Sequence, residues 1–210
     1  QSLYSDLGFI LLGLLVERLT GRSLAAFCRE RVYDPIGVRS LRFMNGRNDE
    51  EPMALVAATE DDPWRGRILQ AEVHDENAYA LGGVAGHAGL FGTATGVAAI
   101  TGLWLENCRG KTGFLLPDLV RRFVSRQATP GSSWGLGWDT PSPPSSSGRH
   151  FSSRAFGHLG FTGTSIWIDP RCDLEVVLLS NRVHPTRRNT AIQKFRPMIH
   201  DVVYEQMGRR

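Results

Sequence analysis

Two short stretches of the sequence place residues with useful chemistry beside a predicted structural element. Tyr4-Ser5-Asp6 sets a phenol and a carboxylate two residues apart at the start of an apolar helical segment. His158-Leu159-Gly160 stands before a segment with the pattern of a strand. A phenol and an imidazole can both transfer protons, and a small residue at the start of a strand lets a substrate lie against the backbone, with the imidazole near developing charge. The two stretches therefore suggest an active site.

Each stretch also has a purely structural interpretation. Tyr4 and Asp6 suit an aromatic staple and a helix N-cap, and a histidine before a strand suits an ordinary hydrogen bond. His87, in the sequence AGHAG, fits a loop that lines a pocket and fits a structural role equally well. The same two interpretations apply to His74 and Asp75, and the histidine spacing matches no metal-binding motif. We predict neither a metal nor a cofactor.

Three local motif matches lie in the wrong context. Gly131-Ser132-Ser133-Trp134-Gly135 fits the nucleophile-elbow pattern, but no strand precedes it and no helix follows it. Gly110-Lys111-Thr112 lacks the leading glycine of a phosphate-binding loop, because Leu105 occupies that position. Lys111-Thr112-Gly113 spells K-T-G, but it lies in a turn between two predicted helices, whereas that triad has to open a strand. We expect none of the three to be functional.

The first 130 residues are predicted to be mainly helical. Over residues 6–20 the apolar side chains recur with the spacing of a helix that buries one face; they are Leu7, Ile10, Leu11, Leu14 and Leu15. Asp6 is the predicted N-cap and Gly21 the predicted stop of this helix. A second helix follows Ser23 and closes at Asp34-Pro35. Residues 45–80 are predicted to be irregular, and residues 82–96 are dense in glycine.

Two further helices complete this part of the chain. One starts at Thr93 or Thr95 and runs through Leu105, and the other runs from Pro117 through Val124. We therefore predict a partial helical lobe over residues 1–130.

The remainder, residues 131–210, is predicted to contain a sheet and a closing helix. Alternation predicts a strand over 164–169, and the apolar run 174–179 predicts its antiparallel partner. A helix is predicted from residue 189 to 207 with a kink near Pro197; its inward residues are Ile192, Phe195, Ile199 and Val202. Helices followed by strands and a final helix favour an α+β fold.

Composition narrows the possible partners. The 210 residues are 41% hydrophobic and 21% charged, as in a globular domain with a core. The net charge of +3 comes from scattered arginines without an aromatic-interleaved stripe, so we do not expect nucleic-acid binding. The longest apolar run, residues 7–16, is too short for a membrane span, which needs about 20 residues. Three distant cysteines, Cys28, Cys108 and Cys172, indicate neither a metal site nor a disulfide framework.

Several segments in order along the chain resemble the class C β-lactamase-related serine hydrolases. They are YSD before LGFILLGLLVERLTG, GGVAGHAGLFGTA before a helix, GLGWD, GHLGFTGTSIWIDP and LEVVLLSNRVHP. This superfamily includes penicillin-binding proteins, esterases, D-peptidases and muramyl-peptide amidases. The stretch VHDENAYALGGVAGHAGLFGTA resembles its envelope members in particular. The resemblance implies the β-lactamase/transpeptidase-like fold, in which a helical lobe adjoins an antiparallel sheet flanked by helices.

The resemblance also implies roles for individual residues. Tyr4 takes the place of the tyrosine in the Y-x-N motif, which relays protons between the nucleophile and the leaving group. Asp6 takes the asparagine position, which orients the substrate. His158, Leu159 and Gly160 align with the K/H-T-G triad, where His158 is catalytic and the other two line the substrate site. The backbone N–H of Phe161 is then an oxyanion-hole donor, and His87 remains a candidate for substrate binding.

Two of these positions depart from the family pattern. Asp6 replaces an amide donor by a carboxylate, which cannot donate a hydrogen bond when ionised. Leu159 removes a threonine hydroxyl that would hold a substrate carboxylate. Both changes favour action on an ester or amide over efficient β-lactam hydrolysis.

The sequence contains no S-x-x-K, the motif that activates the serine nucleophile in this superfamily. Cys108 and Ala191 stand three positions before the two lysines, Lys111 and Lys194. Since the family places the motif upstream of the tyrosine, we expect the nucleophile helix and the first strands to lie outside these 210 residues.

The function implied by the resemblance is acyl transfer through a serine ester. A peptidoglycan-derived muramyl peptide is the expected substrate. A β-lactam or small ester is the first alternative, and a catalytically inactive fragment or binding module is the second. The resemblance suggests a periplasmic or secreted protein, and no oligomeric state is predicted.

Overall fold

The structure is a computed structural model that describes residues 2–45, 55–111 and 113–207. The chain divides into two compact units. The sheet unit consists mainly of Ala98–Arg182 and Asn189–Arg210, and the helical unit consists of Leu3–Val97 and Val183–Arg188. The short segment Val183–Arg188 thus comes from late in the sequence but belongs with the first hundred residues. Each unit is described by itself.

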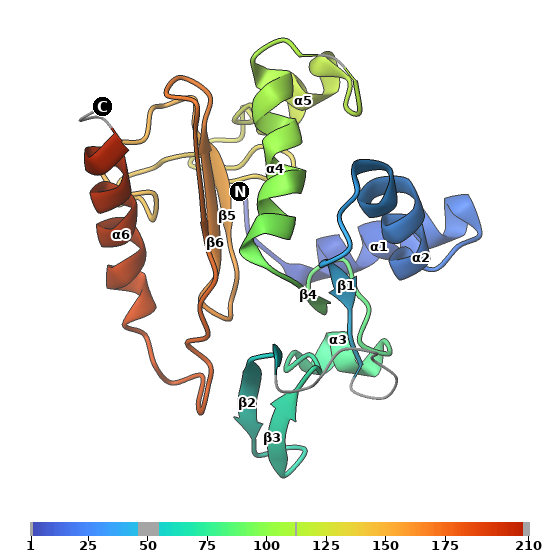
Figure 1. The fold of residues 1–210 in the computed structure, drawn as a ribbon. Helices are drawn as coiled ribbons and strands as arrows, with labels where there is room; N and C mark the ends of the chain where they lie inside the picture. Colours follow the sequence, from blue (N-terminus) through green and yellow to red (C-terminus); the bar gives the residue numbers. More distant parts are fainter. Residues whose placement is uncertain (1, 46–54, 112, 208–210) are drawn as a thin grey trace. The chain divides into compact units, whose positions relative to one another are not determined.

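The sheet unit is built on three antiparallel strands in the order β5-β6-β7 (Figure 1). Their bounds are β5 Phe156–Leu159, β6 Ser165–Asp169 and β7 Leu174–Leu178. Leu159 pairs with Ser165 at one end, and Asp169 pairs with Leu174 at the other. The two strands predicted from the sequence are therefore confirmed to within one residue at each end.

Helices cover both faces of this sheet (Figure 1). They are α4 Ala94–Cys108, α5 Pro117–Val124 and α6 Ile192–Met207. On one face Leu105 of α4 packs with Phe156 and Ile168. On the other face the buried ring of Trp167 packs in a cluster to which α6 contributes Val203. A sheet with helices on both sides agrees with the predicted α+β class.

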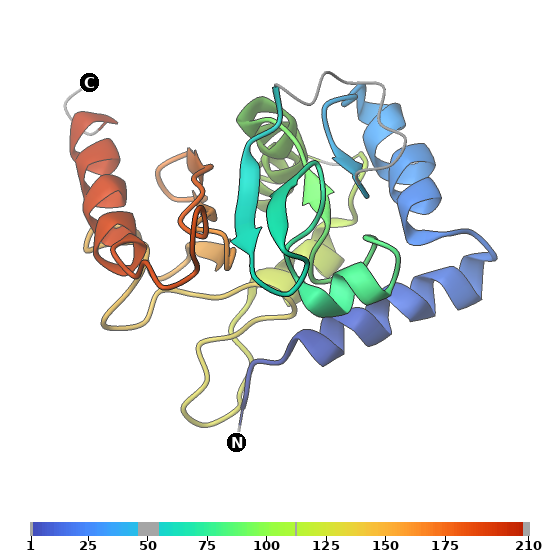
Figure 2. The same cartoon turned by 90° about the horizontal axis from the view of Figure 1, so that it is seen from below.

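The helical unit contains the remaining helices and two small ribbons (Figure 2). Its helical segments are α1 Asp6–Thr20, α2 Leu24–Cys28, a π-helical turn Arg29–Tyr33, a 3₁₀ turn Asp34–Ile36 and α3 Glu76–Ala80. Its strands are β1 Arg42–Phe43, β2 Ala58–Asp62, β3 Arg67–Gln70 and β4 Leu90–Phe91. Antiparallel pairs form between β1 and β4 and between β2 and β3.

Helix α1 has the predicted length but not the predicted buried face. Gly21, with φ +67°, accepts the left-handed conformation that ends the helix, as expected. Ser5 rather than Asp6 is the N-cap: its side chain accepts a hydrogen bond from the Leu7 N–H, and Asp6 is the first helical residue. The only buried residue of the helix in the described structure is Gly13. The leucines of the predicted buried face are 47–66% exposed; they are Leu7, Leu11, Leu14 and Leu15.

Three other predictions need correction. Of residues 45–80, predicted to be irregular, 58–70 contain the β2–β3 hairpin and Glu76–Ala80 form α3, while 46–54 lie outside the described residues. His158 and Leu159 end strand β5 instead of opening a strand, and Gly160 lies in the turn that follows. In α6 the buried residues are polar, namely Arg196, His200 and Asp201, while the predicted inward residues Phe195 and Val202 are exposed.

Candidate active site

Tyr4 and Asp6 form a pair at the start of α1. The Tyr4 side chain is 47% exposed, and its ring lies 6.0 Å from the ring of Phe9. Burial of its other half, the negative charge of Asp6 and a hydrogen bond to the Asp6 carboxylate raise the pKa of Tyr4 to about 12. The phenol therefore keeps its proton at neutral pH, in the electrostatic field of the neighbouring Asp6 carboxylate.

Close backbone packing fixes the helix that carries this pair. A side chain on Gly86 would approach the Phe9 carbonyl oxygen to 2.1 Å, and one on Gly13 would meet the Gly86 nitrogen at 3.2 Å. The glycine-rich loop therefore lies directly on the first turns of α1. This contact explains the glycines at these positions: only a residue without Cβ allows two backbones to come so close.

His87 sits in the same loop and is bound by Asp75. Its side chain is 2% exposed, and its Nε2 lies 2.8 Å from Asp75 Oδ1. The same oxygen accepts the Ala78 N–H and caps α3. Although burial acts to raise it, these hydrogen bonds hold the pKa of Asp75 below its usual value. Asp75 is therefore a carboxylate that accepts a hydrogen bond from His87, and this contact joins the loop to the start of α3; a role of His87 in substrate binding stays a prediction.

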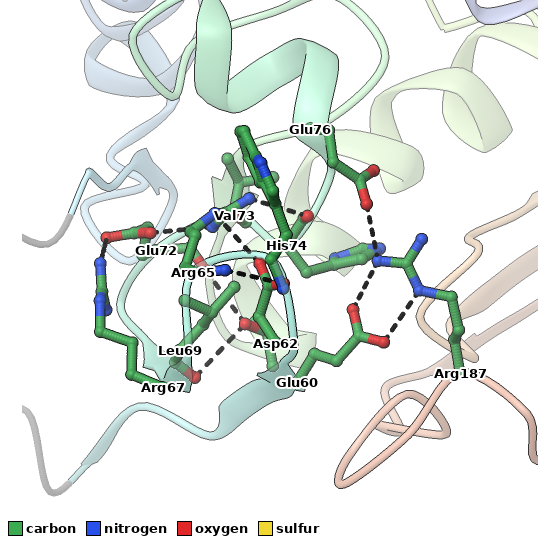
Figure 3. A network of polar contacts seen from close by, with 12 residues as sticks. Glu60, Asp62, Arg65, Arg67, Leu69, Glu72, Val73, His74, Glu76 and Arg187 are labelled. Carbon is green, nitrogen blue, oxygen red and sulfur yellow. Dashed lines mark hydrogen bonds and ion pairs between the residues drawn. The ribbon is translucent and has the colours of Figure 1, made fainter.

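A network of charged side chains supports the backbone before Asp75 (Figure 3). The buried guanidinium of Arg65 forms ion pairs with Asp62 at 3.1 Å and Glu72 at 2.8 Å. It also donates to the carbonyls of Val73 and His74. Burial lowers the pKa of His74, so its imidazole is neutral near pH 7. These contacts favour the structural interpretation of His74, whose backbone carbonyl binds Arg65 and whose imidazole is buried.

Arg187 joins this network from the late segment Val183–Arg188. It binds both carboxylate oxygens of Glu60, at 2.8 and 2.6 Å, and Glu76 at 3.0 Å (Figure 3). Glu60 is only 2% exposed. The bidentate pair therefore fastens the segment to the β2–β3 hairpin.

The second part of the candidate site lies at the end of β5 in the sheet unit. The ring of His158 packs beside that of Trp134, with centroids 5.4 Å apart. Its Nδ1 lies 2.9 Å from the Leu159 carbonyl oxygen. Because a carbonyl oxygen can only accept, Nδ1 carries a hydrogen and donates a hydrogen bond to it. On the edge away from β6, Gly157 exchanges backbone hydrogen bonds with Asp139.

The turn after β5 is held from several sides. Gly160 donates its N–H to the Thr164 carbonyl at 2.9 Å, and a Cβ on Gly160 would meet Thr164 Oγ1 at 2.0 Å. The turn therefore requires glycine at position 160, because any side chain there would collide with Thr164. Arg196 donates to the carbonyls of Gly160 and Thr164, at 2.6 and 2.7 Å, and Arg182 donates to that of Phe161 at 2.7 Å.

The predicted site residues therefore fall into two groups. Tyr4 and Asp6 are together, His87 belongs to the same unit, and His158 to Phe161 are together in the other unit. That the two groups line one cleft stays a prediction, as do the roles assigned to their residues.

Sequence reasoning missed the supporting residues. Trp134 appears in the sequence analysis only as part of the rejected nucleophile-elbow match at residues 131–135. No sequence pattern distinguishes Arg182 from the other arginines. Arg196 carries a usable signal, because helical spacing places it four residues from Ile192 and His200, on the inward face.

In the ranges 2–45, 55–111 and 113–207, no group of three or more histidine, cysteine, aspartate or glutamate side chains is arranged to hold a metal ion. Over the same ranges, no helix has the length and apolar character to cross a membrane.

Comparison with known proteins gives consistent similarities. The family model for beta-lactamase matches residues 1–195. The chain is 31% identical over 198 residues to an N-acetylmuramyl-L-alanine amidase from Bacillus subtilis (strain 168), covering 88% of this chain and 45% of that protein. It is 30% identical over 199 residues to a protein of Escherichia coli (strain K12) provisionally named a D-alanyl-D-alanine carboxypeptidase, covering 88% and 46%. The chain thus spans about half the length of these relatives.

A solved structure shows the same fold. A β-lactamase from Mycobacterium bovis superposes with a TM-score of 0.66 at 22% sequence identity, covering 98% of this chain and 64% of that one.

Proposed function

The chain belongs to the beta-lactamase family, and from that premise we propose that the protein is a serine acyl hydrolase that cleaves the amide bond between N-acetylmuramic acid and its peptide. The observation that carries the proposal is the phenol of Tyr4, kept neutral by its burial and by the neighbouring carboxylate of Asp6 at the start of α1. Similarity to an N-acetylmuramyl-L-alanine amidase supports the choice of substrate.

The proposed reaction has two steps. In acylation a serine oxygen bonds to the substrate carbonyl carbon and the carbon–nitrogen bond breaks, while the serine proton passes to the leaving amine. Tyr4 suits this transfer because a phenol that keeps its own proton can donate it and accept another in the same step. In the second step water hydrolyses the ester. The serine would come from an S-x-x-K motif, which these 210 residues do not contain.

The sheet unit would stabilise the negative charge of the tetrahedral intermediate. We assign the Phe161 N–H as a donor to this oxyanion. We assign His158 the catalytic position of the triad; its Nδ1–H is engaged by the Leu159 carbonyl, and its Nε2 is buried within the described part of the chain.

The side chains at two positions favour an amide over a β-lactam. Asp6 accepts hydrogen bonds and cannot donate one when ionised, which suits an amine leaving group that gains a proton. Leu159 offers no hydroxyl for the carboxylate that every penicillin carries.

The test uses the protein as its gene encodes it and the 210-residue chain, side by side. Muramyl dipeptide is supplied to each, and release of N-acetylmuramic acid and the free dipeptide is followed by chromatography with mass detection. Fluorescent penicillin and a fluorophosphonate report acylation. We expect the gene product to cleave muramyl dipeptide and the 210-residue chain to remain unlabelled.

Three outcomes would contradict the proposal. The gene product fails to react with muramyl dipeptide, it hydrolyses β-lactams much faster than muramyl dipeptide, or the 210-residue chain itself takes up a probe.

A further inference from the structure

The peptide unit between Gly160 and Phe161 has two functional ends. Its N–H belongs to Phe161 and is the oxyanion donor of the proposed function. Its C=O belongs to Gly160 and accepts two hydrogen bonds, from the Gly163 N–H at 3.1 Å within the turn and from the charged Arg196 Nη2 at 2.6 Å. What binds the carbonyl end of this peptide therefore acts on the N–H end as well.

Arg196 is an unusual residue to find at this carbonyl. It projects from α6 and is 7% exposed. Within the part of the chain that the structure describes, no carboxylate forms a salt bridge with it, and its Nε makes no hydrogen bond. Burying a guanidinium without an anionic partner is costly. A neutral amide donor would hold the same two carbonyls without that cost.

A second arginine acts on the next peptide. Arg182 Nε donates to the Phe161 carbonyl at 2.7 Å, and its guanidinium lies 4.0 Å from the centre of the Phe161 ring. The carbonyls on both sides of the Phe161 Cα are thus bound by arginines, and the orientation of the intervening N–H is fixed. Burial lowers the pKa of Arg196, and the positive charge of Arg182 acts in the same direction.

The charge has an effect on the peptide itself. A cation at the carbonyl oxygen withdraws electron density through the conjugated peptide group, so the N–H becomes a stronger donor. An N–H that is both oriented and polarised before the substrate arrives is what stabilisation of a developing oxyanion requires.

We propose that Arg196 is a positioning residue that orients and polarises the Gly160–Phe161 peptide, so that the Phe161 N–H stabilises the oxyanion of the reaction. The inference rests on the proposed function for its catalytic consequence, and on the contacts of the turn for its physical basis.

The kinetic test compares three variants of the gene product on muramyl dipeptide. Arg196→Met removes the charge and the hydrogen bonds, and Arg196→Gln keeps an amide donor without the charge. Arg149→Met is the matched control, because Arg149 also binds α6, through Asp201, but is 77% exposed in its side chain. We expect kcat to fall about 10- to 100-fold in Arg196→Met, less than the loss of a whole oxyanion donor, with KM within about twofold. Arg196→Gln should fold like the wild type and still lose about 10-fold in kcat.

A spectroscopic test reads the peptide without any turnover. Labelling with ¹³C-carbonyl glycine and ¹⁵N-phenylalanine selects Gly–Phe peptides, which in these 210 residues are Gly8-Phe9, Gly113-Phe114 and Gly160-Phe161. Loss of a cross-peak in Phe161→Leu assigns the third. In Arg196→Met and Arg196→Gln we expect the Gly160 carbonyl and the Phe161 amide proton to shift upfield while the Gly8-Phe9 peak stays in place.

The outcomes separate this inference from the proposed function. A fall in kcat with constant KM and a selective shift of the Gly160 carbonyl supports it. Wild-type kcat in both Arg196 variants overturns it. A fall in kcat together with a rise in KM and shifts of all three peaks also overturns it, because that combination indicates a general structural role. If the wild type does not cleave muramyl dipeptide, the proposed function fails, and the peak of Gly160 alone decides whether Arg196 polarises the peptide.

Discussion

The two groups of candidate site residues are built in opposite ways. At the start of α1 the candidate reactive group is the Tyr4 side chain, which is half exposed, and the helix that carries it is held by backbone packed on backbone through Gly13 and Gly86. At the end of β5 the candidate reactive group is a backbone N–H, and buried or partly buried arginine side chains hold it in place.

This difference determines how each group responds to mutation. A side-chain hydroxyl can be deleted without moving the backbone, so its chemistry and its support are separable. A backbone donor cannot be deleted, and it is altered only through residues such as Arg196 that touch the same peptide. In the helical unit, a substitution at Tyr4 should therefore lower the rate without lowering stability, and a substitution at Gly86 should lower stability.

The largest expected effect is on stability, from Gly86→Ala. The added Cβ would lie 2.1 Å from the Phe9 carbonyl oxygen, a backbone atom that cannot rotate away. We expect the free energy of unfolding to fall by about 3 kcal/mol, at the upper end of overpacking penalties. Urea unfolding of the gene product, monitored by circular dichroism, measures it.

A control comes from the same helix. A Cβ added at Gly8 would meet no neighbouring atom within 4 Å, so Gly8→Ala should stabilise the protein by up to about 1 kcal/mol through helix propensity. Equal effects of the two substitutions would show that the glycine-rich loop does not lie on α1.

The next largest effect is on catalysis, from Tyr4→Phe. Removing the hydroxyl should lower kcat on muramyl dipeptide about 100-fold if Tyr4 carries protons, which corresponds to about 2.7 kcal/mol. Stability should change little, because the ring and its contact with Phe9 remain. Tyr204→Phe, on α6, is the control and should keep wild-type kcat. An unchanged kcat in Tyr4→Phe would reduce Tyr4 to a packing residue.

A third prediction contrasts the contacts of two arginines, one buried and one partly exposed. Arg196 has only carbonyl partners among the described residues, whereas Arg187 is paired with the buried Glu60. Arg187→Met should lower the free energy of unfolding by about 2 kcal/mol at pH 7, since it leaves a buried carboxylate without its charged hydrogen bonds. Arg188→Met, next in sequence and exposed, should change it by less than about 0.5 kcal/mol.

The effect of Arg187→Met should depend on pH in a defined direction. The hydrogen bond from Arg187 lowers the pKa of Glu60 below its usual value. The pair therefore contributes fully above the pKa of an unfolded glutamate, about 4.3, and the contribution is lost as the pH falls through the lower folded pKa. Urea unfolding at pH 7 and at pH 3 should show the difference between wild type and Arg187→Met shrinking. A constant difference would mean that the pair contributes through packing alone.

Sequence patterns predicted the elements of this fold better than their burial. Periodicity located α1 and its end at Gly21, because helix spacing and a glycine stop are local properties. It misidentified the buried face, because apolar spacing shows that side chains share a face and not that another element covers it. The β2–β3 hairpin was missed because its buried positions are Glu60 and Asp62 on β2, and charged residues do not signal an inward face.

The candidate site was predictable only where it has a local sequence signature. Tyr4-Ser5-Asp6 and His158-Leu159-Gly160 stand next to recognisable elements, so both could be found by reading along the chain. Arg196 reaches Gly160 from 36 residues away, and Arg187 reaches Glu60 from 127 residues away. Contacts of this kind depend on how the chain folds back on itself, which no local pattern encodes.

The smallest expected effect, from Asp6→Asn, tests how strongly the first pair is coupled. Burial is the largest cause of the raised pKa of Tyr4, followed by the charge of Asp6 and their hydrogen bond. The substitution removes the charge and leaves the burial, so the pKa should fall from about 12 yet remain above the ordinary value of about 10. Titration of ¹³Cζ-labelled tyrosine by NMR measures this, with Tyr33 as an internal control that should not move. The same variant should regain an amide donor and shift the ratio of β-lactam to muramyl dipeptide turnover upward. An unchanged pKa and an unchanged ratio would together mean that Asp6 only begins the helix, and Tyr4 would then act without a carboxylate partner.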